Sequence, residues 1–156
     1  MEIRTANASH IPDILTLLRQ VCEVHHRIRP DIFRSSALKY TPEQLVALLA
    51  DETRPIFVAE DAGRVVGYCF CQIRSFDGTG VSTCRKELYI DDLCVEETRR
   101  GQHIGSALFN RAAQFARAAG CRSLTLNVWC GNEAALRFYE HAGLTPRNMT
   151  METELC

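Results

Sequence analysis

Two stretches of this sequence pass from a strand pattern through a glycine-containing turn directly into a helix pattern, and they constrain the fold most. In the first, the apolar segment Glu87–Val95 leads through a basic turn into the amphipathic segment Ile104–Ala119. In the second, Ser123–Val128 leads through Gly131 into Asn132–Ala142. Strands and helices that interleave in this way form a sheet covered by helices.

The remaining periodicities extend this alternation along the chain. Apolar residues at three- and four-residue spacing predict a first helix over 8–27. Thr41-Pro42, with Gln44 three residues after the cap, is typical of a helix start and predicts a helix over 42–50. Further strands are predicted at 2–5, 56–60, 65–74 and 150–155, with a Gly- and Ser-rich loop at 76–83. The predicted fold class is α/β, with a single mixed central sheet flanked by helices on both faces.

Length and charge narrow the class of protein. The 156 residues correspond to one domain, which we expect to span 1–156. Lys and Arg total 18 against 19 for Asp and Glu, and a net charge of −1 favours neither nucleic acid nor an anionic membrane as a partner. No apolar run approaches the ~20 residues that span a bilayer, and the N-terminus lacks the apolar segment of a signal peptide. These features predict a soluble, cytoplasmic protein.

Eight cysteines are present, and none follow the Cys-x-x-Cys spacing that is typical of zinc sites. Without an export signal they are expected to be reduced and to act as small apolar side chains, and no metal site is predicted. Cys69 and Cys71 are two residues apart in a predicted strand, so they should share one face of it. The eight are Cys22, Cys69, Cys71, Cys84, Cys94, Cys121, Cys130 and Cys156.

The turn between Val95 and Ile104 has the properties of an anion site. The first turn of a helix presents unpaired N–H groups and the positive end of the helix dipole, and small residues let a phosphate approach. Arg99 and Arg100 add charges that can pair with phosphate. The Gly-x-Gly-x-x-Gly dinucleotide fingerprint and the Gly-Lys-Ser/Thr of a P-loop are both absent. A tight strand-to-helix connection without any ligand would also explain the turn.

A second motif favours a ligand. Asn132 and Tyr139 are two helical turns apart, which places them on one face of the predicted helix. This motif extends through Phe138-Tyr139-Glu140-His141-Ala142-Gly143-Leu144 and follows the loop Arg100-Gly101-Gln102-His103-Ile104-Gly105. Together the two resemble the GNAT superfamily of N-acetyltransferases, which use acetyl-coenzyme A (acetyl-CoA). The resemblance is specific over residues 90–144 and loose over the first sixty.

The resemblance implies a role for each matching residue. Main-chain groups of Leu93, Cys94 and Val95 would bind the acetyl and pantetheine portions. Asn132 would contact the pantetheine arm, and Tyr139 would stand near the thioester sulfur as general acid. The pyrophosphate would be bound by Arg100 and by the N–H groups of Gly101, Gln102, His103, Ile104, Gly105 and Ser106. His103 stands where the family usually has Gly, and a left-handed backbone there would cost about 1 kcal/mol.

Acetyl transfer to an amine also needs a proton acceptor. Deprotonating an alkyl amine of pKa ~10.4 costs about 4.6 kcal/mol at pH 7, and a carboxylate acting through a water can take that proton. Tyr89-Ile90-Asp91-Asp92-Leu93 is similar to the Leu-Glu-Asp stretch of the polyamine-acetylating branch, whose Glu acts as base, and this puts the base at Asp91. Glu87 is the second candidate, because an unbroken strand would aim Glu87 and Asp91 to one face and Asp92 to the other. Surface ion pairing is the alternative role for these carboxylates.

We therefore expect an N-acetyltransferase that moves an acetyl group from acetyl-CoA, by direct attack and without a metal, to a primary amine of a small molecule or peptide. The acidic strand indicates a cationic acceptor, such as a polyamine, an aminoglycoside-like amine or a peptide amino group. The alternative is a non-catalytic acyl-CoA-binding module, which His103 favours. A thiol-rich metal or redox module is a third interpretation. Exposed strand edges make a homodimer a further expectation.

Overall fold

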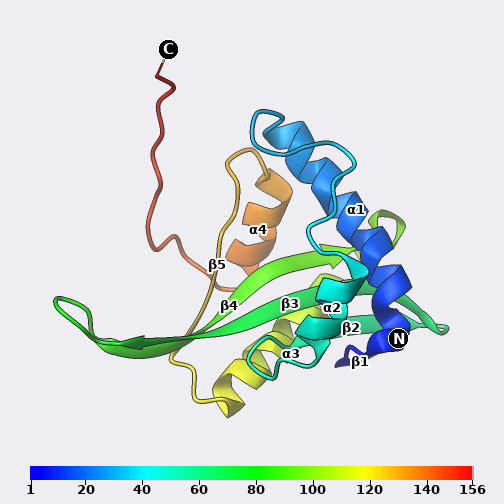
Figure 1. Cartoon of the computed structure of the whole chain (residues 1–156), viewed down its shortest axis with the longest axis horizontal. Helices are drawn as coiled ribbons and strands as arrows, with labels where there is room; N and C mark the ends of the chain where they lie inside the picture. Colours follow the sequence, from blue (N-terminus) through cyan, green and yellow to red (C-terminus); the bar gives the residue numbers. More distant parts are fainter. Residues whose placement is uncertain (156) are drawn as a thin grey trace.

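One mixed sheet forms the centre of the protein (Figure 1). The computed structural model describes residues 1–155, and its five strands lie in the order β1-β2-β3-β4-β5. Neighbours from β1 to β4 are antiparallel, and β5 is parallel to β4. The predicted mixed sheet is therefore confirmed. The strands are β1 (Glu2–Thr5), β2 (Ile56–Asp61), β3 (Arg64–Asp77), β4 (Cys84–Val95) and β5 (Ser123–Leu126).

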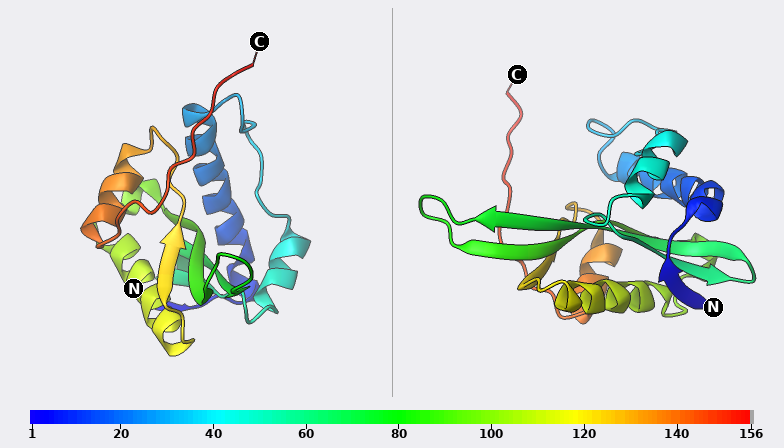
Figure 2. Two further views of the ribbon diagram at one scale, coloured as in Figure 1. Left: turned by 90° about the vertical axis from the view of Figure 1, so that its left-hand side faces the viewer. Right: turned by 60° about the horizontal axis from the view of Figure 1, so that its bottom comes forward.

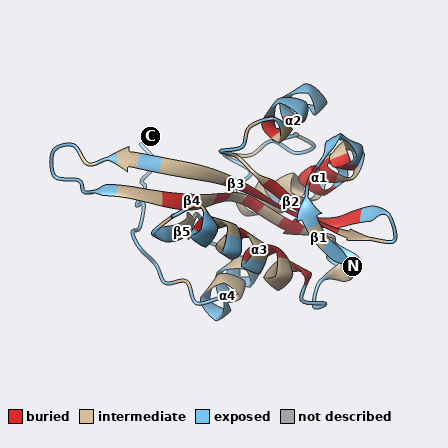
Figure 3. Ribbon diagram, turned by 90° about the horizontal axis from the view of Figure 1, so that it is seen from below, coloured by how far each residue is buried: buried red, intermediate tan, exposed pale blue. Residues whose placement is uncertain are grey.

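Helices cover both faces of this sheet, as predicted. The pair α1 (Ile11–Ile28) and α2 (Pro42–Leu49) lies on one face, and the pair α3 (Ile104–Ala118) and α4 (Glu133–His141) lies on the other (Figure 2). Each pair closes its own apolar cluster against the strands. The buried residues follow the central part of the sheet between these layers (Figure 3).

Local capping sets where the helices begin. The Thr41 hydroxyl accepts a hydrogen bond from the Gln44 amide while the Gln44 side chain accepts one from the Thr41 amide, so the predicted capping box starts α2. The predicted first helix is divided, because a 3-10 helix, η1 (Ala8–His10), precedes α1. A second 3-10 helix, η2 (Glu97–Arg99), follows β4.

The strands β3 and β4 form a long hairpin that extends beyond the helices (Figure 1). A loop was predicted over 76–83, but strand pairing continues to Asp77 opposite Cys84. The loop is therefore confined to 78–83, and the hairpin presents a longer face than the sequence pattern indicates.

A β-bulge interrupts β4 within the predicted acidic site. Phe70 pairs with Asp92 and Cys71 pairs with Ile90, which leaves Asp91 as the extra residue of β4. The alternation of side chains shifts at this point, so Asp91 and Asp92 both face the α1–α2 side of the sheet. The prediction that Asp92 faces the opposite side is wrong, because it assumed an unbroken strand.

The cysteines behave as small side chains in the part of the chain that the structure describes. Seven are free thiols there, and Cys156 lies outside it. Cys69 and Cys71 share a face as predicted, with their sulfur atoms 3.7 Å apart. No three His, Cys, Asp or Glu side chains of residues 1–155 come together in a way that could hold a metal ion.

The C-terminal segment leaves the sheet beside β5 and carries no regular structure from residue 144 to 155 (Figure 1). The strand predicted at 150–155 is therefore wrong: its alternation is weak, and no strand of residues 1–155 pairs with it. Side chains tie the segment to the body, since Arg147 donates to Glu87 and Arg29 pairs with Glu152. Across residues 1–155, every helix falls short of the length and apolarity needed to cross a bilayer.

Candidate active site

A cleft of about 500 Å³ opens where β4 and β5 separate. The strand β5 pairs only with Glu87–Ile90 of β4, so the end of β4 has no strand partner on that side. The start of α3 and one face of α4 complete the walls. The sequence-predicted residues that line the cleft are Leu93, Cys94, Val95, Arg100, Gly101, His103, Ile104, Gly105, Ser106, Asn132 and Tyr139.

The loop before α3 presents a row of free amides to this cleft. Within residues 1–155, the N–H groups of Gly101, Gln102 and His103 donate to no backbone carbonyl, and Ala107 makes the first helical bond, to the His103 carbonyl. The amides of the first turn of α3 are therefore also unpaired. Gln102 belongs to this loop, although its side chain is not part of the cleft lining.

The backbone conformation of this loop favours glycine at position 101 and is strained at the histidine of position 103. Gly101 has φ +78° and His103 has φ +59°, both in the left-handed region. A Cβ atom in that region costs about 1 kcal/mol, so His103 retains the amide of the family pattern at some expense in stability. Gly105 serves another purpose: a Cβ there would lie 3.4 Å from the ring of Phe138, so glycine allows α3 and α4 to pack closely.

The two arginines of the loop differ in their availability. Arg99 is held by Asp61, whose Oδ2 lies 2.6 Å from its Nη2. Both arginines line the cleft, but Arg100 pairs with no carboxylate among residues 1–155. Arg100 is therefore the loop cation that is free to meet a phosphate.

Gln20 of α1 is a cleft residue that sequence reasoning missed. Its Nε2 donates to the Val95 carbonyl at 3.0 Å, and its Oε1 accepts from the Glu97 amide at 3.0 Å. These bonds fix the end of β4 and engage the Val95 carbonyl. Residues so far apart in the chain leave no local pattern that could have revealed this contact.

Tyr139 and Asn132 lie on the α4 wall, on the face that their spacing predicts. The Tyr139 ring packs against Phe138 with centroids 5.0 Å apart, and its hydroxyl has no hydrogen-bond partner within residues 1–155. Burial raises the pKa of Tyr139 above its ordinary value, and the charge of nearby Asp92 adds to the effect. The Asn132 Oδ1 caps α4 by accepting from the Ala135 amide, which leaves its NH₂ group free.

The adjacent carboxylates Asp91 and Asp92 have opposite environments. Asp91 accepts from the Tyr40 hydroxyl at 2.7 Å and pairs with Lys39 at 3.0 Å, and these contacts outweigh burial and lower its pKa. Asp92 is buried and accepts only from the Tyr68 hydroxyl among the described side chains, and burial raises its pKa to about 6. Neither side chain lines the cleft itself.

Glu87, the second predicted base, lies apart from the cleft lining. Its buried carboxylate accepts from Arg147 at 2.9 Å and faces Arg85 at 3.8 Å. Glu87 is therefore engaged in ion pairs, which is the alternative role that the sequence left open.

A mixed sheet that opens over the N-terminus of a helix, with free amides at the opening, is the arrangement that the resemblance to the GNAT superfamily of acyltransferases implies. The chain belongs to the acetyltransferase (GNAT) family, whose model matches residues 18–144. It is thus an acetyl-CoA-dependent N-acetyltransferase by family.

Comparisons with individual proteins agree with this assignment. The thialysine N-epsilon-acetyltransferase of Mus musculus is 26% identical over 144 residues, covering 90% of this chain and 82% of that protein. An uncharacterized N-acetyltransferase of Methanocaldococcus jannaschii is 32% identical over 95 residues, or 60% of this chain and only 40% of that protein. The crystal structure of a mutant BH1408 protein from Bacillus halodurans has a TM-score of 0.96 at 31% identity and covers 100% of both chains.

Proposed function

We propose that this protein transfers the acetyl group of acetyl-CoA to a primary amine of a small molecule or peptide, by direct attack of the amine on the thioester. The cleft is the observation that supports the proposal, because its features lie in the same order as the parts of the coenzyme molecule. Free amides and Arg100 suit the pyrophosphate, the open edge of β4 suits the pantetheine amides, and Tyr139 suits the sulfur.

Coenzyme binding in this proposal relies mainly on the backbone. The amides from Gly101 to Ser106 surround the pyrophosphate, and Arg100 adds a charge. The backbone groups of Leu93 and Val95 that point away from β3 bind pantetheine as a neighbouring strand would. The free NH₂ group of Asn132 donates to the same arm while its carbonyl oxygen continues to cap α4.

Proton removal from the amine is assigned to the acidic pair of β4. The sequence favours Asp91, but Lys39 and Tyr40 hold this carboxylate and make it a weak proton acceptor. With a pKa of about 6, Asp92 is ionised at neutral pH and more basic than an ordinary carboxylate, so we propose it as the base, acting through water. Asp91 then keeps the amine nearby through its charge. Glu87 is the weakest of the three candidates because two arginines engage it.

Proton delivery to the leaving thiolate is assigned to Tyr139. Its raised pKa keeps the hydroxyl protonated across the physiological range. The same apolar surroundings raise the pKa of a thiolate formed beside it, which reduces the mismatch between the two groups. A main-chain N–H at the end of β4 would stabilise the tetrahedral oxyanion.

An assay of thiol release from acetyl-CoA across a panel of aliphatic primary amines tests the proposal. Amine-dependent release, with an N-acetylated product seen by mass spectrometry, is expected. The alternative of a non-catalytic acyl-CoA-binding module predicts coenzyme binding by calorimetry and no release with any amine. That outcome would contradict the proposed function, but it would still agree with a coenzyme-binding site in the cleft.

A further inference from the structure

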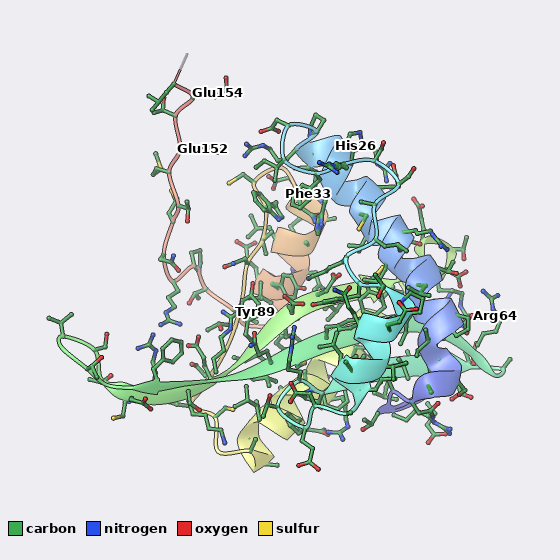
Figure 4. The ribbon with its side chains drawn as sticks, in the orientation of Figure 1. His26, Phe33, Arg64, Tyr89, Glu152 and Glu154 are labelled. Atoms are coloured by element: carbon green, nitrogen blue, oxygen red, sulfur yellow. The ribbon has the colours of Figure 1, made fainter. Side chains whose placement is uncertain are left out.

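The outer part of the β3–β4 hairpin presents a sheet face that no helix of residues 1–155 covers (Figures 1 and 4). We call it the hairpin face. It begins at Tyr89, labelled in Figure 4, and continues outward from the bulge at Asp91. Its side chains come from cross-strand pairs: Gln72 and Tyr89, Arg74 and Glu87, and Phe76 and Arg85.

Arg74 is the one cation of this face without a carboxylate partner within residues 1–155. Its guanidinium carbon lies 3.4 Å from the centroid of the Tyr89 ring, and its Nε donates to Gln72 at 3.3 Å. By contrast, Arg85 faces Glu87, which Arg147 also binds. Stacking on an aromatic ring and one bond at Nε fix a guanidinium while leaving its two terminal nitrogens for a ligand.

The bulge and the adjoining hairpin face differ in the sign of their charge. At the bulge, Asp91 and Asp92 face Lys39, and Arg54, which contacts Tyr40, adds a second and more distant positive charge. On the hairpin face, Arg74 and Arg85 accompany one carboxylate, Glu87, which Arg147 of the C-terminal segment also binds. A ligand that lies across both parts therefore meets an acidic end beside the proposed base and a basic end beside Tyr89.

We propose that Arg74 binds an anionic group, a carboxylate or a phosphate, on the same molecule whose amine is acetylated. This inference rests on the proposed function and narrows its acceptor to amines that carry an anion. At about 3.3 Å per residue, Tyr89 lies roughly 7 Å from Asp91 along β4, which fits an amine and an anion separated by about six bonds. A polyamine would bring a second positive charge against Arg74, so it fits this surface less well.

The experiment compares four acceptors that each end six bonds from the amine nitrogen: hexylamine, 1,5-diaminopentane, 6-aminohexanoate and 4-aminobutyl phosphate. For the wild-type protein, kcat/KM should be highest with one of the two anionic amines, and the better of the two identifies the anion. Arg74→Ala should lower kcat/KM for that acceptor at least about tenfold, mainly by raising KM. The same substitution should change kcat/KM for hexylamine by less than about twofold. Arg74→Lys should restore part of the loss.

Arg85→Ala is the matched control, because Arg85 lies on the same face but has the Glu87 carboxylate 3.8 Å away, whereas Arg74 has no carboxylate partner within residues 1–155. It should leave the preference for an anionic amine unchanged. A wild-type preference for the diamine would overturn this inference, and so would an equal loss of kcat/KM with all four amines in Arg74→Ala. In either case, acetylation of hexylamine would still support the proposed function. No turnover with any of the four would overturn both.

Discussion

The hydroxyl of Tyr68 donates a hydrogen bond to Oδ2 of Asp92, 3.1 Å away, and both side chains are buried beneath α1. Together with the charge of Lys39 and the Leu93 amide, this donor does not compensate for burial of the carboxylate, so the pKa of Asp92 is raised to about 6. The neighbouring Asp91 has a lowered pKa because Lys39 and Tyr40 both contact it. The bulge thus places on one face two carboxylates with different basicity.

Replacing Asp92 with Asn should abolish most of the proton-accepting capacity of the site. We expect kcat/KM to fall about a hundredfold or more in Asp92→Asn, and by less in Asp91→Asn. The ratio of wild-type to Asp92→Asn kcat/KM should rise with pH through about 6 and then level off, because titration of the amine is common to both proteins. If Asp91→Asn instead lost more kcat/KM than Asp92→Asn, and the ratio of wild-type to Asp92→Asn kcat/KM did not change with pH, Asp91 would be the base.

The same substitution should stabilise the fold at neutral pH. The pKa of Asp92 is higher in the folded state than in the unfolded chain, so the folded state binds the proton more tightly, and the free energy of unfolding falls as pH rises from about 4 to about 6. The resulting cost is on the order of 2–3 kcal/mol above pH 6, and Asn does not incur it. Urea denaturation at pH 4.5 and pH 8 should show the advantage of Asp92→Asn growing with pH.

Asp91→Asn is the control for this pH dependence, and its sign is opposite. Because the folded-state pKa of Asp91 is lowered, its charge stabilises the fold above the unfolded pKa, and that contribution is lost as pH falls through the folded value. Asp91→Asn should therefore be less stable than the wild type at pH 8. Equal pH profiles for the two variants would contradict the environments assigned to the two carboxylates.

Removing the Tyr139 hydroxyl should impair chemistry and spare coenzyme binding. Tyr139→Phe keeps the ring against Phe138 and is expected to lower kcat at least about tenfold, while the Kd for CoA measured by calorimetry stays within about twofold. Tyr89→Phe retains a ring that can stack with Arg74 and serves as the control with little change in kcat. An unchanged kcat in Tyr139→Phe would remove Tyr139 from the mechanism.

Arg100 should contribute to coenzyme affinity by charge. Arg100→Ala is expected to raise the Kd for CoA about tenfold at low salt, and raising the salt concentration should reduce the difference from wild type. Arg122→Ala, an exposed change outside the cleft, should leave the Kd unaltered. Identical Kd values for Arg100→Ala and wild type in low salt would place Arg100 outside the pyrophosphate site.

His103 allows backbone strain to be separated from side-chain binding. His103→Gly relieves the left-handed conformation and should raise the free energy of unfolding by up to about 1 kcal/mol, whereas His103→Ala keeps the strain. If only the His103 amide contacts the coenzyme, both variants should bind CoA as the wild type does. A comparable loss of CoA affinity in both would instead assign the imidazole a direct contact.

Most of the fold could be predicted because its signals are local. The capping box at Thr41, the apolar stripe of α1 and the turns at Gly101 and Gly131 each depend on a few neighbouring residues. The amide loop and the spacing of Asn132 and Tyr139 were likewise found by motif. The predicted strand at 150–155 failed because a strand forms only where another strand offers an edge, and a weak alternation cannot supply one.

By itself the sequence predicted the order of most helices and strands, the family and the candidate residues of the proposed coenzyme cleft, since these follow from periodicity and from motifs on single segments. Only the tertiary structure decided which carboxylate of the bulge is the more deeply buried, which arginine of the loop before α3 has no carboxylate partner, and that Gln20 fixes the end of β4. The physical reason is that each of these depends on contacts between distant segments: Gln20 reaches Val95 across 75 residues, and one extra residue in β4 turns Asp92 toward Tyr68. Such contacts set burial and charge pairing, which no local pattern encodes.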